Sequence, residues 1–146
     1  MAALANYLEN SLIDWLLRGQ TFTPPATWYV GLLTAAPSDS AAGTEVSGGS
    51  YARVAVTSSL ANWAGTQAAA STTASSGTGG TTSNNAAITF PAPTASWGVA
   101  THWGLYDAAT AGNLMIYAAL DASKTINNGD AAPTFPAGTL TFQIDN

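Results

Sequence analysis

The residues of this chain that could carry out chemistry are few. The chain has one histidine, no cysteine, three Lys/Arg and eight Asp/Glu among its 146 residues. Charged residues make up 8% of the sequence, against about 25% in a typical soluble protein. Most catalytic proton transfers and nucleophilic attacks use ionisable side chains. This composition therefore argues against an enzyme, and we expect no cofactor.

Each candidate catalytic or ligand-binding pattern has a simpler structural explanation. The lone histidine lacks a Ser motif or carboxylate at nucleophile spacing, so a packing or surface role is favoured over a general base. Three aspartates fall at turns, where a short carboxylate bonds its own backbone, and none belongs to a calcium-loop run. Two glycine clusters lack the following Lys-Ser/Thr helix of a phosphate loop. These residues are His102, Asp107, Asp121, Asp130, Gly48–Gly49 and Gly77–Gly80.

Aromatic side chains are the remaining candidates for a binding site. Large aromatics fill the core of a small β protein or a subunit interface, and this is the favoured interpretation. The alternative is a platform on which sugar rings stack, because carbohydrate-binding modules are also aromatic, uncharged and rich in strands. The residues concerned are Trp63, Trp97, Trp103, Tyr106 and Tyr117.

The charge balance excludes two classes of partner. The formal net charge is −5, and the cations are Arg18, Arg53 and Lys124. Binding nucleic acid requires a basic stripe that neutralises several phosphates, and this chain has none. Anionic membrane surfaces are disfavoured for the same reason. No run approaches the ~20 apolar residues of a membrane span, so we expect neither nucleic acid nor membrane as a partner.

The N-terminal segment is expected to form one helix within residues 1–20. Leu4, Leu8 and Leu12 recur at helical spacing, and Trp15 and Leu16 extend the apolar stripe. Arg18 suits the negative end of the helix dipole, and the glycine that follows is a natural C-terminal cap. We expect this helix to be a docking element attached to a single β domain over residues 21–146.

Residues 21–146 change to the two-residue period of strands. Short alternating segments are separated by Gly, Pro, Asn and Asp clusters, and Asn127–Asp130 is a strong turn signal. Such a series predicts a mainly β fold, an antiparallel jelly-roll-like β-sandwich, with one N-terminal α-helix. The expected strands are Trp28–Thr34, Tyr51–Thr57, Ala87–Phe90, Val99–Tyr106, Leu114–Leu120 and Leu140–Asp145, with residues 99–120 forming a hairpin.

The tract from Ala64 to Ser83 interrupts this pattern. Every residue in it except Gln67 is Ala, Gly, Ser or Thr, so it has no large side chain to bury. It is either a flexible excursion from the β domain or an extended segment that becomes ordered against a neighbouring subunit. The scarcity of charge keeps the second interpretation open.

Several motifs together resemble a known family. Thr23-Pro-Pro-Ala-Thr leads to Trp28-Tyr-Val-Gly-Leu-Leu-Thr34, and Trp97-Gly is followed by Thr101-His-Trp-Gly-Leu-Tyr-Asp107. The segments Gly43–Arg53, Asn85–Pro91 and Lys124–Asp130 complete the set. Nearly the whole chain resembles small virion proteins of tailed bacteriophages, usually labelled tail fibre or minor tail proteins. The family has no catalytic motif, so the resemblance implies no catalytic residue.

The resemblance implies a structural protein of a phage virion, made in the host cytoplasm. Its partners would be copies of itself, with a trimer expected from the habit of phage fibres, and other virion proteins. A tail-associated position in a fibre, collar or baseplate is the favoured hypothesis. A capsid decoration or cement protein is the alternative, and a module that binds a host surface glycan or receptor is the second alternative.

Overall fold

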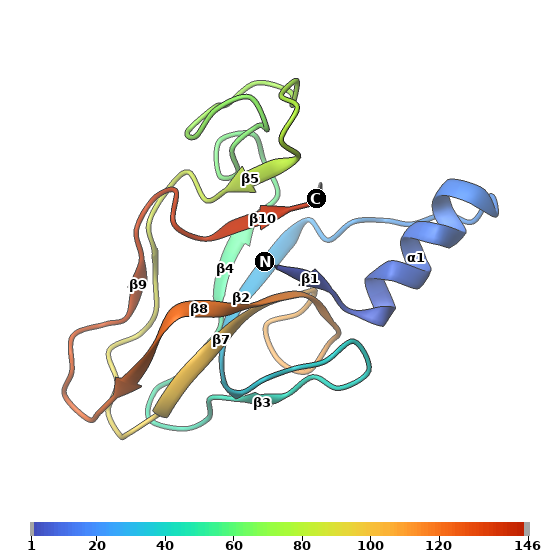
Figure 1. The fold of residues 1–146 in the computed structure, drawn as a ribbon. Coiled ribbons are helices and arrows are strands. Elements are labelled where there is room, and N and C mark those ends of the chain that lie inside the picture. The colour runs from blue at the N-terminus through green and yellow to red at the C-terminus, as the bar shows by residue number, and fades with distance from the viewer. Residues whose placement is uncertain (1, 145–146) are drawn as a thin grey trace.

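The computed structural model describes residues 2–144, and its centre is one antiparallel sheet (Figure 1). The strand order in this sheet is β1-β8-β7-β2-β3, and β4 pairs with the same edge of β2 as β3 does. The strands are β1 (Ala3–Leu4), β2 (Thr27–Ala35), β3 (Thr44–Glu45), β4 (Val54–Thr57), β7 (Gly98–Tyr106) and β8 (Leu114–Ile126).

A second layer of short strands covers one face of this sheet. It contains two pairs, β5 (Thr81–Ser83) with β10 (Thr141–Gln143), and β6 (Ile88–Thr89) with β9 (Thr134–Phe135). Both pairs are antiparallel. The prediction of a mainly β, antiparallel, sandwich-like fold with one helix near the N-terminus is therefore confirmed for the described residues.

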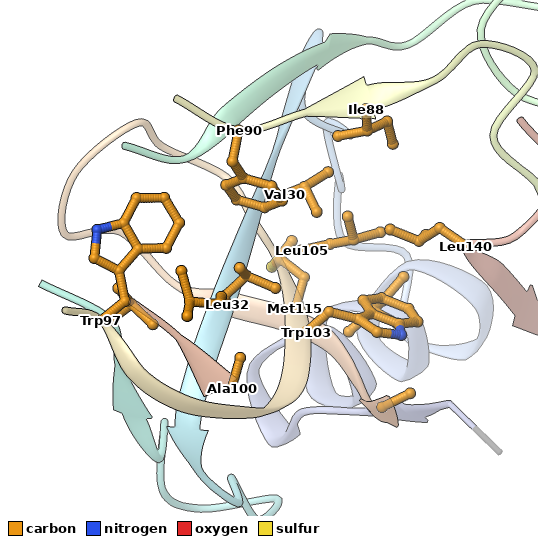
Figure 2. Packing of buried hydrophobic residues seen from close by; sticks show 14 of the residues in the cluster. Val30, Leu32, Ile88, Phe90, Trp97, Ala100, Trp103, Leu105, Met115 and Leu140 are labelled. Atoms are coloured by element: carbon orange, nitrogen blue, oxygen red, sulfur yellow. The ribbon is translucent and has the colours of Figure 1, made fainter. Parts of the chain in front are cut away.

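The hydrophobic core lies between the two layers (Figure 2). In the sheet, Val30 of β2 is opposite Leu105 of β7, and Leu32 is opposite Trp103. Because strand side chains alternate between faces, this register places all four side chains on one face, and each is at most 4% exposed. The second layer contributes buried residues to the same cluster, namely Ile88, Phe90 and Leu140.

The pairing of β7 with β8 is interrupted by a bulge. The register shifts between Ala100 and His102, so four residues of β8 lie opposite Thr101. The alternation expected from the sequence placed Val99 on the same face as Trp103. The bulge changes which residue faces the core: Ala100 is buried at 1% exposure, whereas Val99 is 44% exposed.

The helix α1 (Asn6–Leu17) projects from the side of the sheet, with its C-terminal end away from the β layers (Figure 1). It begins later than expected, because Leu4 pairs with Ile116 in the short strand β1. Leu8 is its only residue classed as buried. Gly19 has the positive φ of +67° that suits a residue just after a helix C-terminus.

The tract from Ala64 to Ser83 forms a compact loop that ends in β5. Its only side chain longer than threonine, Gln67, occupies the centre: its Nε2 donates to the hydroxyls of Ser71 and Thr73 at 2.6 and 2.7 Å. Its Oε1 accepts the backbone N–H of Ser76 at 3.2 Å. Internal hydrogen bonds thus organise a segment that has no large apolar side chain.

One buried amide joins the strand pairs of the second layer. The Asn84 side chain is 0% exposed; it donates to the carbonyls of Ala86 and Pro136 and accepts from the backbone N–H of Leu140 at 2.9 Å. These bonds connect the segment between β5 and β6 with the segment between β9 and β10. All of the amide's bonding partners are backbone groups, so its removal leaves them unsatisfied in the interior.

We therefore expect Asn84→Ala to lower the free energy of unfolding by about 2–4 kcal/mol, because each unsatisfied buried group costs about 1–3 kcal/mol. Chemical denaturation checks this value. Asn10→Ala, an exposed change in α1, is the matched control and should stay within about 0.5 kcal/mol of the parent. Equal effects of the two substitutions would contradict the role given to Asn84.

Candidate functional site

The aromatic residues singled out from the sequence do not form one surface cluster. Trp97, Trp103 and Tyr106 are 3–4% exposed and lie in the interior. The Trp97 indole N–H donates to the carbonyl of Gly49 at 2.9 Å, and the ring meets Tyr51 edge to face. In this position the three side chains offer no open ring face on which a sugar could stack. Their part in a subunit interface or a glycan site stays a prediction.

Trp63 and Tyr117 are half-buried and lie apart from these three. Tyr117 of β8 donates its hydroxyl to Oδ1 of Asp39 at 2.8 Å. Trp63 forms an isolated bridge with Asn84, and its buried indole N–H has no hydrogen-bond acceptor among residues 2–144. Of the five aromatic residues singled out from the sequence, and within residues 2–144, Trp63 alone lines a pocket that is mainly apolar.

The pocket beside Trp63, here called the Trp63 pocket, has a volume of about 340 Å³. It opens between β2, β10 and the segment that follows β4. Among residues 2–144, no charged side chain contributes to its lining. The lining residues used below are Trp28, Ser59, Leu60, Trp63, Ile116 and Phe142.

The ionisable residues show no catalytic arrangement in the part of the chain that the structure describes. His102 shares a hydrogen bond of 2.9 Å between its Nδ1 and the hydroxyl of its neighbour Thr101. Asp107 binds the backbone and side-chain nitrogens of Asn113 at 2.7 Å, as expected for an aspartate at a turn. Within residues 2–144 no group of three or more His, Cys, Asp or Glu could hold a metal ion.

The guanidinium of Arg53 makes four hydrogen bonds. Its Nε and one terminal nitrogen bond the two carboxylate oxygens of Glu45, both at 2.7 Å. The other terminal nitrogen donates to the carbonyls of Ala108 and Ala111 at 2.7 and 2.8 Å. The guanidinium carbon lies 3.4 Å from the ring centroid of Tyr106. Arg53 therefore joins β3, the start of β4 and the turn between β7 and β8.

Tyr51 completes the sheet edge next to this ion pair. Strands β3 and β4 both pair with β2 but leave a gap between them at Leu32. The backbone N–H of Leu32 donates to the Tyr51 hydroxyl at 2.9 Å, and that hydroxyl donates to Glu45 at 2.8 Å. Burial, reinforced by the negative charge of Glu45, raises the pKa of Tyr51 well above its usual value, so the phenol keeps its proton.

Gly31 leaves the space that this network occupies. A Cβ at this position would lie 3.0 Å from Oε1 of Glu45, from the hydroxyl oxygen of Tyr51 and from the ring of Tyr106. The side chains of Glu45, Tyr51 and Tyr106 can therefore pack over this part of β2 because residue 31 has no side chain. Burial and the repulsion from Glu45 raise the pKa of Tyr106 to about 12, although Arg53 acts in the opposite direction.

Sequence reasoning missed the residues of this network. Glu45 lies in a segment expected to be a loop, and Arg53 was noted only as one of three cations. The scarcity of cations was a usable signal, because an arginine within an alternating apolar segment must find a partner when it is buried. The structure also shows how far the predicted stripe of α1 is exposed: Trp15 and Leu16 are 52% and 66% exposed.

We expect Arg53→Lys to destabilise the fold by about 2–4 kcal/mol, because lysine cannot reproduce the paired bonds to Glu45 together with both carbonyl contacts. Breaking a buried ion pair costs about 3–5 kcal/mol, and the partial exposure of Glu45 reduces this cost. Arg18→Lys is the matched control: its exposed pair with Asp14 contributes at most about 1 kcal/mol. Urea denaturation of both variants tests the difference.

The raised pKa of Tyr106 predicts a loss of stability in alkali. The folded chain holds this proton more tightly than the unfolded chain, so stability is complete below about pH 10, the usual phenol pKa. It falls as the pH rises to about 12, by at most about 1.4 kcal/mol per pH unit for this group. Tyr106→Phe should lose less stability over this range than the parent, as measured by thermal unfolding at each pH. Tyr7→Phe, at a half-exposed position, should behave like the parent.

The comparisons with known proteins agree with a structural role. Within residues 2–144 no helix is long and apolar enough to cross a membrane. No curated protein matches the chain. The model of one protein family, described as Podophage GP4 fiber I protein gp80, matches residues 3–143. This match covers nearly the whole chain, including α1, both layers and the loop around Gln67. The chain therefore belongs to the podophage GP4 fiber I protein family and is a phage fibre-type virion protein.

Proposed function

We propose that the chain is a tail-associated component of the virion that assembles with copies of itself, a trimer being the expected state. The single observation that carries this proposal is the exposure of large apolar residues on α1. Ile13, Leu16 and Leu17, here called the helix tip, are 51%, 66% and 81% exposed. They lie at i, i+3 and i+4 and so share one face of the helix.

The helix tip is costly to leave in water. Full burial of a Leu or Ile side chain is worth about 1.5–3 kcal/mol, and the part of α1 that carries the tip extends away from the core (Figure 1). The other end is anchored, because Leu8 is buried and Ala5 donates its backbone N–H to Met115 at 2.9 Å. An anchored helix with an unburied end suits a docking element.

The electrostatics of the chain favour contacts of this type. Copies that each carry a net charge of −5 repel one another, so a stable interface needs an uncharged centre. Glu9 lies one turn before Ile13 on the same helix face, whereas Arg18 and Asp14 neutralise each other through a 2.8 Å salt bridge. The family description, a podophage fibre protein, supports a position on the tail over one on the capsid.

The double substitution Ile13→Ser/Leu17→Ser tests the docking role of α1. Both residues are exposed, so we expect an unchanged circular dichroism spectrum and a loss of incorporation into particles of at least about tenfold, equivalent to 1.4 kcal/mol. The measurement is the amount of the protein in purified virions. Val99→Ser, another exposed apolar position, is the control and should be incorporated normally.

The position in the particle is tested by labelling the protein in intact virions. A tail component should be labelled at the tail and be present in a small multiple of three or six copies. Labelling over the capsid, at a copy number comparable to that of the major capsid protein, would show a decoration protein instead.

A further inference from the structure

Two apolar surfaces of this chain lie on different parts of the molecule and have matching character. The first is the helix tip, which projects from the body. The second is the Trp63 pocket, between β2, β10 and the segment after β4. Both lack charged residues at their centres. Because α1 extends to the side of the sheets (Figure 1), its own tip lies away from its own pocket.

The size of the pocket fits side chains of the helix tip. A cavity of about 150 Å³ holds a benzene molecule, so a volume of about 340 Å³ has room for two Leu or Ile side chains. Its apolar walls come from Trp28, Trp63, Ile116 and Phe142, and Leu60 at the same site is 54% exposed. Hydroxyl residues also contribute to the lining, namely Ser58, Ser59, Ser75 and Thr82.

The polar groups of the two surfaces are also complementary. In the described residues, the carbonyls of Leu16 and Leu17 at the end of α1 receive no hydrogen bond, and the N–H of Gln20, four residues after Leu16, donates to Asp14 instead. At the pocket, the Ser59 hydroxyl accepts from Asn62, which leaves its own proton available. Helix-end acceptors on one copy can therefore meet a hydroxyl donor on another.

We propose that the helix tip of one copy docks into the Trp63 pocket of a second copy. This inference rests on the self-association proposed above and names the surfaces that form it. The contact is heterologous, with different surfaces on the two partners, so every copy offers one free tip and one free pocket. Such contacts close into a ring when the rotation between copies permits it, and a ring of three would give the expected trimer.

Disulfide trapping tests this contact without background, because the chain contains no cysteine. A disulfide requires Cα atoms about 4.4–6.8 Å apart. The full chain with Leu17→Cys is mixed with the full chain with Ser59→Cys under mild oxidation, and the product is measured on non-reducing gels. Ser123→Cys, at an exposed position of β8 seven residues beyond the pocket-lining Ile116, replaces Ser59→Cys in the control mixture.

The expected result is at least about tenfold more mixed dimer with Ser59→Cys than with Ser123→Cys, because docking raises the effective concentration of the two thiols. Equal yields in the two mixtures would overturn the proposal. So would efficient homodimers of Leu17→Cys alone, because they would show that two helix tips meet each other.

A second measurement separates this inference from the proposed function. Light scattering should show that Leu60→Glu, which places a charge at the pocket, reduces self-association at least as strongly as Ile13→Ser/Leu17→Ser does. If only the helix substitutions dissociate the oligomer, the helix docks elsewhere: the inference fails while the proposed function stands. Particles that contain no copies at the tail would instead remove the proposed function, whatever the disulfide result.

Discussion

The ion pair between Arg53 and Glu45 is the interaction on which the edge of the main sheet depends. It brings together the end of β3, the start of β4 and the turn between β7 and β8. Between β3 and β4, where this edge of β2 has no strand partner, the Tyr51 hydroxyl accepts a hydrogen bond from the backbone N–H of Leu32 and donates one to Glu45. Isolated buried charges are unfavourable, but here four of the five N–H donors of the guanidinium bond a carboxylate and two carbonyls. A chain with very few cations thus uses one of them in its interior.

The sequence was most informative where alternation and packing agree. The strands β2 and β7 matched their expected ranges to within one residue at each end, because Val30, Leu32, Trp103 and Leu105 alternate on one buried face. The predicted alternation of buried and exposed residues was wrong around Thr101, where the register of β7 and β8 shifts. Such a bulge depends on how the two strands pair and cannot be recognised from the sequence of one strand. The short strands β1, β3, β5 and β9 were not predicted, since two or three residues carry too little periodicity to be recognised. They exist because tertiary contacts supply their partners.

The accessibility of the candidate site residues could not be predicted from the sequence either. Composition indicates which residues are aromatic, but burial decides whether a ring can meet a partner: Trp103 packs under the second layer, whereas Trp63 lines a pocket. The helix stripe was visible in the sequence, yet one helix of twelve residues can turn only part of its apolar surface to a small body. Leu8 takes the inner position, and the residues of the helix tip stay exposed. The absence of charged residues from the helix tip and from the described lining of the Trp63 pocket is one local expression of the low charge content of the chain.

The loop around Gln67 has an evolutionary consequence. Its conformation depends on one amide and on small hydroxyl residues, and it contributes no large side chain to the core. Loops of this kind accept insertions and exchanges more readily than strands do, because such changes leave the packed layers undisturbed. Changes in this segment would therefore leave the scaffold of the two packed layers intact. Gln67 is the exception, because its amide makes the hydrogen bonds that fix the conformation of the loop.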